Sequence, residues 1–452
     1  MHNVLVIGAG AAGLMAAAAA SQAGCSVTVL EKNEKAGKKI YITGKGRCNF
    51  TNACAPEDFF AHVMRNSRFM YSSFYGMTNE DVMSFFENAG MKVKVERGSR
   101  AFPVSDHASD VTGSLLRILG RQGVRICYHT QVSHLIVTGG KEQGKRAAGV
   151  LLADGSRLTA DAVIVCCGGL SYPSTGSTGD GYAFARETGH SVTSCLPSLV
   201  PLRVKEEELC RQMQGLSLRN VSLKMTKGKK TLYEEQGEML FTHFGVSGPL
   251  VLTASTQLPV LNPKKQKTSE ASDKQKTSEQ SDRPGRQFPD AGFDLEDLQL
   301  HIDLKPALTK EKLDERLLRE IAAAENKQVK NMLGKLYPAK MVPVMIDLSG
   351  VDPEIKCNSL TRQQREDLVR ITKDLTMHVT GTGGFGEAII TRGGVDVKQI
   401  RPDTMESKLV SGLYFAGEVL DLDAVTGGFN LQIAWSTGAA AGRGAAAAAG
   451  CS

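Results

Sequence analysis

The sequence predicts an α/β fold of the Rossmann type, formed by one discontinuous domain into which β-rich and helical parts are inserted. Three short apolar runs that reach glycine predict the parent domain: Val4–Ile7 before Gly8, residues 161–169 (DAVIVCCGG) and residues 412–417 (GLYFAG). Such runs are typical of strands that are buried on both faces of a parallel sheet. Because the third run follows a stretch of different texture, we expect the chain to return to its first domain there.

The first apolar run opens a βαβ unit, in which a helix over Gly13–Ala23 and a strand over Val27–Leu30 follow. Residues 8–13 (GAGAAG) fit the pattern G-x-G-x-x-G between strand and helix. This pattern predicts that Gly8, Gly10, Ala11, Ala12 and Gly13 bind the pyrophosphate of a dinucleotide. Glu31 ends the second strand, where its carboxylate can accept hydrogen bonds from ribose hydroxyls and disfavours a 2′-phosphate. The alternative is an incidental glycine-rich turn.

The stretch 31–52 (EKNEKAGKKIYITGKGRCNFTN) favours FAD over NAD as the dinucleotide. Lysines and an arginine lie there among glycines, and a loop that follows a ligand from its adenosine end to a second, larger half needs such donors. The alternative is a basic loop facing solvent. The candidate cofactor-binding residues of this stretch are Lys32, Lys39, Gly44, Arg47, Cys48 and Asn49.

The middle of the chain differs in texture from the Rossmann runs. Residues 197–254 contain alternating stretches that predict short antiparallel strands, and the polar segment 262–287, in which QKTSE occurs twice, predicts a disordered surface loop. Helical spacing follows over Leu308–Leu336 and over Thr361–Leu375. We therefore expect a FAD-binding domain made of residues 1–195 and 381–452, a β-rich domain over 196–306 and a helical insert over 307–380.

Composition excludes several classes of protein. The formal net charge of +6 is spread along the chain, so nucleic acid is not expected as a partner. The ten cysteines lack metal-ligand spacing, which predicts reduced thiols and no metal site. Neither a signal peptide nor a membrane span is indicated, so we expect a cytoplasmic protein that acts on a small molecule. The oligomeric state is left open.

Five stretches in order carry a resemblance to a known family: VLVIGAGAAGLMAA, GKKIYITGKGRCNFTN, GGLSYPSTGSTGDGYAFARETGH, GEMLFTHFGVSGPLVL and GLYFAGEVLDLDAVTGGFNLQIAWSTG. Together they resemble the bacterial NAD(P)/FAD-dependent flavoproteins that include 3-dehydro-bile-acid reductases and aminoacetone oxidases. The resemblance implies a two-dinucleotide-type FAD domain interrupted by a barrel-like and a helical insert. It also implies that Gly168 and Val132 lie along the FAD.

The stretch after the third apolar run should serve the flavin half of the same ligand. The wider class has Gly-Asp where this chain has Gly417-Glu418, so whether Glu418, Asp421 or Asp423 contacts the ribityl chain is open. Residues 426–430 open the final helix, whose first amides would face the pyrimidine edge of the flavin. Gly428, Asn430 and Leu431 are the candidates there. The alternative is a glycine-rich helix that only packs closely.

The sequence says less about proton transfer and substrate. His243 and Tyr172 are the candidate catalytic residues, because imidazole titrates in the useful range and a phenol can donate to a carbonyl oxygen. The resemblance implies reduction of a C=C bond conjugated to a ketone, as in 3-oxo bile acids, with NADH or NADPH as electron donor. Oxidation of a small amine such as aminoacetone by O₂, and an RNA-associated or sensing flavoprotein, are the alternatives.

Overall fold

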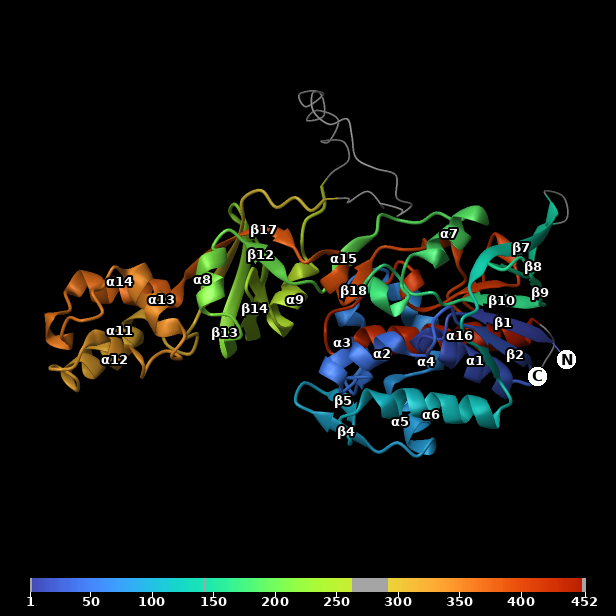
Figure 1. Ribbon diagram of the computed structural model, residues 1–452, viewed down its shortest axis with the longest axis horizontal. Coiled ribbons are helices and arrows are strands. Elements are labelled where there is room, and N and C mark those ends of the chain that lie inside the picture. The colour runs from blue at the N-terminus through green and yellow to red at the C-terminus, as the bar shows by residue number, and fades with distance from the viewer. Residues whose placement is uncertain (1, 141–143, 262–291, 449–452) are drawn as a thin grey trace, which may run out of the picture. The chain divides into compact units, whose positions relative to one another are not determined.

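The computed structural model describes residues 2–140, 144–261 and 292–448, which form two compact units (Figure 1). Unit 1 consists of residues 1–198 and 385–452, and unit 2 of residues 199–384. The sequence placed these limits at 195/196 and 380/381, and its further division of the insert at residue 306 stays a prediction. The polar loop predicted over 262–287 lies outside the described residues.

A five-stranded parallel sheet forms the centre of unit 1. Its strands are β1 (Asn3–Ile7), β2 (Ser26–Leu30), β6 (Arg125–Cys127), β10 (Ala162–Val165) and β20 (Leu413–Phe415), in the order β20-β10-β1-β2-β6. Every residue of β10 and β20 is buried, as the continuous apolar runs predicted. The three runs of the sequence analysis are therefore neighbours in one sheet, and the predicted Rossmann fold is confirmed.

Two helices of small residues pack against each other beside this sheet: α1 (Ala11–Gln22) and α16 (Phe429–Ala447), which Figure 1 draws in blue and in red. Both helices are buried almost all round. A Cβ on Gly438 would lie 2.4 Å from the carbonyl oxygen of Ala12, and one on Gly442 would lie 2.3 Å from that of Ala16. The glycines of α16 are therefore required because the two helix backbones approach so closely.

Smaller elements complete unit 1. A mixed sheet contains β7 (Val132–Gly140), β8 (Gly144–Leu152), β9 (Arg157–Thr159) and β19 (Val410–Ser411). One antiparallel sheet contains β3 (Thr51–Asn52), β5 (Arg100–Pro103) and β4 (Val93–Glu96). A second antiparallel sheet pairs β11 (Leu196–Ser198) with β18 (Ile390–Arg392). The helices are α2 (Lys38–Ile42), α3 (Pro56–His62), α4 (Tyr71–Gly76), α5 (Asn79–Asn88), α6 (Ala108–Arg121) and α7 (Asp180–Glu187), and α15 (Gly384–Glu387) lies at the boundary of the units.

Unit 2 is centred on a closed barrel of six antiparallel strands. In order around the barrel they are β12 (Leu202–Val204), β15 (Gly245–Ser247), β14 (Lys230–Phe241), β13 (Ser217–Lys227), β16 (Leu298–Asp303) and β17 (Leu375–Thr382). Leu223, Leu300 and Met377 are among the side chains that fill its core. The inserted barrel is thus confirmed, and its last strand, β17, begins within the range 307–380 that was predicted as helical insert.

The helices of unit 2 are α8 (Glu207–Gln212), α9 (Pro249–Ser255), α11 (Lys310–Ala322), α12 (Val329–Leu333), α13 (Met341–Ser349) and α14 (Arg362–Lys373). Thr361 caps α14 as predicted, since its hydroxyl accepts the amide of Gln364 at 3.2 Å. The single helix expected over 308–336 is instead two helices separated by a turn. At the end of the range 197–254, in which short strands were expected, the chain forms α9 instead, because a proline at the first helical position suits a helix start. Within the described ranges, no helix is long and apolar enough to span a membrane.

Candidate functional site

A cleft of unit 1 lies at the carboxyl ends of the central strands, where parallel α/β sheets bind their ligands. The ends of β1, β2, β10 and β20 reach it at Ile7, Leu30, Cys166 and Ala416. It has about 1270 Å³ of unfilled space, counting its open mouth. Thirteen of the predicted cofactor-binding residues line it, namely Gly8, Gly10, Ala11, Ala12, Glu31, Lys32, Lys39, Val132, Gly168, Gly417, Glu418, Asn430 and Leu431.

The three glycines of the GAGAAG turn have different roles. Gly8 has φ +103°, and a Cβ there would lie 2.6 Å from the carbonyl oxygen of Cys166. A Cβ on Gly13 would lie 1.9 Å from the carbonyl oxygen of Gly8, so Gly13 serves helix–strand packing and does not line the cleft. Around Gly10, by contrast, a Cβ would meet nothing within 4 Å. Gly10 is therefore not required by packing, and the space above it suits a ligand that approaches the backbone.

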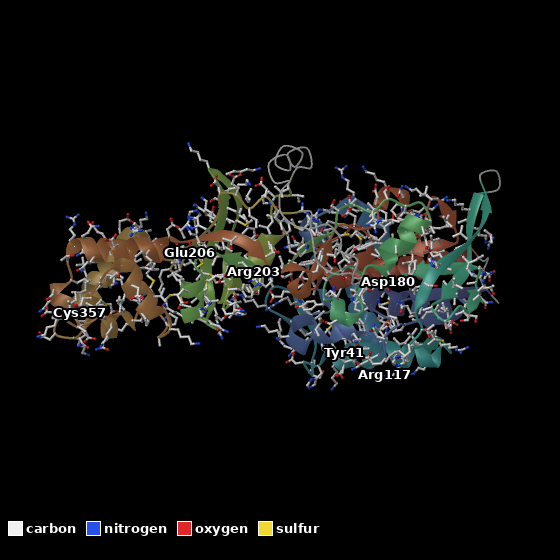
Figure 2. The ribbon with its side chains drawn as sticks, turned by 45° about the horizontal axis from the view of Figure 1, so that its top comes forward. Tyr41, Arg117, Asp180, Arg203, Glu206 and Cys357 are labelled. Carbon is white, nitrogen blue, oxygen red and sulfur yellow. The ribbon has the colours of Figure 1, made fainter. Side chains whose placement is uncertain are left out.

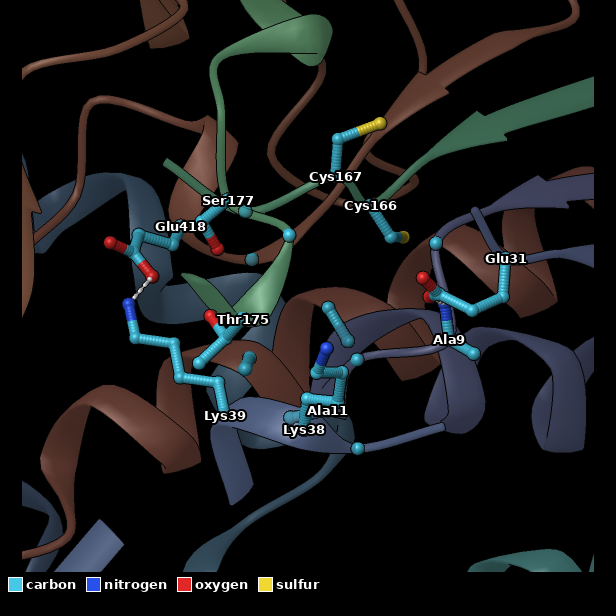
Figure 3. A pocket seen from close by; sticks show the side chains of 18 of the residues that line it. Ala9, Ala11, Glu31, Lys38, Lys39, Cys166, Cys167, Thr175, Ser177 and Glu418 are labelled. Carbon is cyan, nitrogen blue, oxygen red and sulfur yellow. Dashed lines mark hydrogen bonds and ion pairs between the residues drawn. The ribbon is translucent and has the colours of Figure 1, made fainter. Parts of the chain in front are cut away.

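Glu31 is bound to the same turn. Its carboxylate accepts the amide of Ala9 at 2.7 Å, and the amide and side chain of Asn33 at 2.8 and 2.6 Å. The side chain is only 7% exposed and borders the cleft, as Figure 3 shows. A carboxylate has about four acceptor positions, so one remains for a ribose hydroxyl. Glu31 thus fixes the turn and can also bind the adenosine end of a dinucleotide.

The opposite side of the cleft in Figure 3 contains an ion pair between Lys39 and Glu418. The Nζ atom of Lys39 lies 2.6 Å from Glu418 Oε2 and 2.6 Å from the hydroxyl of Ser171. The other oxygen of Glu418 accepts the Ser171 hydroxyl and the amide of Thr391. Lys32 is paired in the same way with Asp180, at 2.7 Å. The lysines predicted to bind the cofactor therefore also hold carboxylates of the cleft wall.

The N-terminus of α16 lies at this cleft, together with that of α1. Asn430 and Leu431 in the first turn of α16 line it, as do Ala11 and Ala12 in the first turn of α1. The first amides of a helix have no acceptor within the helix and carry a positive partial charge. Two such N-termini on one cleft suit a ligand with negative charge at two separated positions. FAD, with its pyrophosphate and the pyrimidine edge of its flavin, fits this arrangement.

The side chain of Asn430 holds the loop before α16 in place. It accepts the amide of Ala424 at 2.9 Å and donates to the carbonyl oxygen of Ala424 at 2.8 Å. Gly428 has φ +96°, and a Cβ there would lie 2.4 Å from the carbonyl oxygen of Thr51. Gly428 therefore permits the turn into α16 without lining the cleft.

Five other predicted cofactor residues do not reach the cleft, namely Gly44, Arg47, Cys48, Asn49 and Asp421. Arg47 forms ion pairs with Glu96 and Asp106, and its guanidinium lies 4.3 Å from the ring centroid of Phe102. Cys48 is fully buried. Part of the basic loop is thus used for local ion pairs and packing, whereas the alternative considered for it was a loop facing solvent.

Sequence reasoning missed a second group of cleft residues. Thr175, Gly176 and Ser177 line the cleft from the loop after β10, and Ile389 and Ile390 line it from β18 and the residue before it. The hydroxyl- and glycine-rich stretch 174–181 was a signal for the first group. Nothing in the apolar pair 389–390 distinguishes it from an ordinary core strand.

The candidate catalytic residues lie in different units. Tyr172, in unit 1, follows Gly168-Gly169 in a left-handed conformation, with φ +50°, and is not among the residues that line the cleft. Burial and the charge of Glu387 raise the pKa of its phenol. His243, in unit 2, is exposed in the turn between β14 and β15. Their catalytic roles stay predictions.

The cysteines of the described chain are not paired in disulfides. Burial raises the pKa of both Cys166 and Cys167, which border the cleft as thiols. Among the described residues, no group of three or more His, Cys, Asp or Glu side chains could hold a metal ion.

Comparison with known proteins gives one family and several relatives. The family described as HI0933-like protein Rossmann domain matches residues 2–444. The chain is 32% identical over 451 residues to the 3-dehydro-bile acid delta(4,6)-reductase of Clostridium scindens, covering 99% of each chain. It is 31% identical over 435 residues to the ribosomal RNA dihydrouridine synthase of Haemophilus influenzae and 28% identical over 436 residues to that of Escherichia coli, covering 96% of each chain in both cases.

Solved structures resemble the chain at much lower identity. The 3-ketosteroid delta1-dehydrogenase from Sterolibacterium denitrificans, solved in complex with 1,4-androstadiene-3,17-dione, has a TM-score of 0.47 at 14% identity. The similarity covers 99% of this chain and 100% of that one.

Proposed function

Because the chain belongs to the HI0933-like Rossmann-domain family and is a FAD-dependent oxidoreductase, we propose that it reduces a carbon–carbon double bond conjugated to a carbonyl group. NADH or NADPH is the proposed electron donor. One observation carries the proposal: the two activities named among the relatives both saturate such a bond. A delta(4,6)-reductase of a 3-dehydro-bile acid removes double bonds conjugated to a ketone, and a dihydrouridine synthase removes the uracil double bond conjugated to a carbonyl.

The cleft of unit 1 would bind the FAD along its length. Amides at the start of α1 would bind the pyrophosphate, and Glu31 would accept a ribose hydroxyl. The first amides of α16 would face the flavin and stabilise negative charge at its pyrimidine edge. When bound, FAD supplies the hydride for the electron-poor alkene carbon. The chain itself has to orient the substrate, exclude water and deliver a proton.

Proton delivery is the step for which the chain offers two candidates. Tyr172 is the one in unit 1, because a phenol is protonated at neutral pH and can donate its proton; burial and the charge of Glu387 raise its pKa and so make it a weaker acid. His243 is the candidate in unit 2. Comparing Tyr172→Phe with His243→Gln tests them: the variant that loses substrate reduction while NAD(P)H still reduces its flavin identifies the donor.

A bile-acid or steroid-like enone is the proposed substrate, because the bile-acid reductase matches nearly the full length of this chain at 32% identity. Uridine in ribosomal RNA is the second candidate, since two relatives with that printed activity match 96% of the chain. The expectation that nucleic acid is not a partner is therefore not confirmed.

The deciding experiment is an anaerobic titration of the FAD-loaded protein with NADH and NADPH, followed through the flavin absorption band. The proposal expects bleaching by one or both nucleotides, and recovery of the band when a 3-oxo-4-ene or 3-oxo-4,6-diene steroid acid is added. Recovery only with uridine-containing ribosomal RNA would select the second candidate.

The same titration separates these reductases from the alternative amine oxidase. An oxidase would keep its oxidised band with NADH and NADPH, would bleach with aminoacetone and would release peroxide in air. That result would overturn the proposed reduction of a conjugated double bond.

A further inference from the structure

The barrel of unit 2 carries a cluster of side chains that is separate from the residues lining the FAD cleft. It includes Arg203, which Figure 2 labels. We call Arg203, His243 and Phe244 the barrel rim. The guanidinium carbon of Arg203 lies 4.6 Å from the ring centroid of Phe244, and the ring of His243 meets the same ring edge-on, with centroids 4.9 Å apart. Phe244 is buried, whereas Arg203 and His243 are exposed. Two nitrogen donors thus flank one fixed aromatic ring.

The backbone around Arg203 is built to hold it there. The pairing of β12 with β17 shifts register between Arg203 and Val204, a β-bulge of the kind that re-aims a side chain. Across that pairing, Gly381 lies opposite Arg203, and a Cβ there would touch the Arg203 side chain at 3.5 Å. On the other side, Gly245 pairs with Arg203, and a Cβ there would lie 2.1 Å from the carbonyl oxygen of Leu202. The strands therefore fix the backbone at Arg203, and its guanidinium lies over the Phe244 ring.

The barrel rim has donors but no acid. In the part of the chain that the structure describes, no carboxylate lies within ion-pair distance of Arg203 or His243, whereas His378 on β17 is paired with Glu206 at 2.7 Å. Beside His243, the hydroxyl of Thr242 is buried and has no hydrogen-bond partner among the described residues. A planar guanidinium with five donors suits the two oxygens of a carboxylate or phosphate. The rim is thus an oriented set of donors that lacks an acceptor.

We propose that the barrel rim binds an anionic oxygen group of the substrate, a carboxylate or a phosphate. The inference rests on the proposed function and adds a residue that determines specificity. Arg203 supplies the charge and the paired donors, and the ring of Phe244 supports its guanidinium. A bile-acid side chain would offer the carboxylate, and RNA would offer the phosphate.

The test compares Arg203→Ala and Arg203→Lys with the parent, all loaded with FAD. Arg219→Ala is the matched control, because Arg219 is an exposed barrel arginine on β13 with the same charge. The substrates are 3-oxo-4-cholenoic acid and its methyl ester, which differ only in the anionic group. Flavin content and Tm establish that each variant is folded and loaded.

Arg203→Ala should raise KM for the acid about 10- to 150-fold, the range expected for losing a hydrogen bond to a charged group. KM for the ester should change less than about twofold, and Arg203→Lys should recover part of the loss because it keeps the charge without the fork. Flavin content and reduction by NAD(P)H should equal those of the parent. Equal losses for acid and ester, or the same loss in Arg219→Ala, would overturn the proposal.

Direct binding separates this inference from the proposed function. If the parent reduces neither steroid, calorimetry on the FAD-loaded parent and Arg203→Ala proteins uses the acid, its ester, inorganic phosphate and a uridine oligoribonucleotide. Binding of the acid or the phosphate that Arg203→Ala weakens supports the rim, whatever the reaction is. If Arg203→Ala weakens binding of the oligoribonucleotide alone, the anion bound by the rim is a phosphate of RNA. A parent that binds none of these anions refutes the rim.

Discussion

Gly10 separates cofactor binding from folding more cleanly than any other residue of the GAGAAG turn. Its φ of −83° and ψ of −170° are open to every amino acid, and a Cβ there would meet no protein atom within 4 Å. Gly10→Ala should therefore leave the FAD-free protein intact. It should even stabilise that form by about 0.4–1 kcal/mol, because alanine lowers the entropy of the unfolded chain.

With FAD the expected effect has the opposite sign. The added methyl group stands where the pyrophosphate has to approach the amides at the start of α1. Losing one hydrogen bond to a charged group costs about 1.5–3 kcal/mol, which corresponds to roughly 10- to 150-fold in Kd. The FAD-free form of Gly10→Ala should thus have a Tm equal to or above that of the FAD-free parent. The same variant should bind FAD much more weakly than the parent does.

The assay is a titration of the FAD-free protein with FAD, followed by quenching of flavin fluorescence, alongside thermal unfolding without FAD. Gly13→Ala is the matched control, since its Cβ would lie 1.9 Å from the carbonyl oxygen of Gly8 and should destabilise the protein before any ligand is added. An FAD affinity within twofold of the parent in Gly10→Ala would refute the placement of the pyrophosphate. A large drop in the Tm of its FAD-free form would refute the claim that packing does not need Gly10.

Three further outcomes follow from the described contacts. Glu31→Ala removes the acceptor of the Ala9 and Asn33 amides, so both the Tm without FAD and the FAD affinity should fall; a variant that binds FAD like the parent would contradict the ribose placement. Gly438→Ala puts a Cβ 2.4 Å from the carbonyl oxygen of Ala12 and should cost about 1–3 kcal/mol in denaturant unfolding, and an unchanged midpoint would mean that α1 and α16 can separate. His190 is buried between Thr188 and Ser407, and this burial lowers the pKa of its imidazole. Below about pH 6.5 the histidine of the unfolded chain therefore takes up a proton that the native histidine does not. The free energy of unfolding falls as a result. His190→Gln should show a smaller loss of Tm than the parent between about pH 7.5 and 5.5, and equal losses would exclude this histidine as the cause.

The first βαβ unit and the start of α16 could be predicted from the sequence because their signals are local. A glycine pattern between a strand and a helix, an acid after the next strand and a glycine turn before a helix each fall within a few residues. Local packing dictates these residues: Gly13 must be small because the carbonyl of Gly8 lies against it.

Pairings between distant residues could not be predicted. Lys39 was expected to bind the cofactor, but its partner Glu418 stands 379 positions away, and only the folded sheet brings the two together. The prediction that Arg47 binds the cofactor was wrong for a similar reason. Folding of the β3-β5-β4 region brings Glu96 and Asp106 to Arg47, which forms ion pairs with both. The closure of the barrel likewise depends on β12 and β17, which are joined through the whole of unit 2. The type of a residue alone does not predict which distant residue the fold will bring into contact with it.

The packing of α1 against α16 also has a consequence for how the protein is made. A ribosome adds about 5–20 residues per second, so α1 leaves it on the order of tens of seconds before α16 is synthesised. During that time the alanine-rich surface of α1 that packs against α16 stays uncovered, while unit 2 is synthesised as one continuous stretch and has all its strands available. Cofactor loading therefore has to follow completion of the chain, and chaperones that shield apolar segments should act on the N-terminal half of nascent chains.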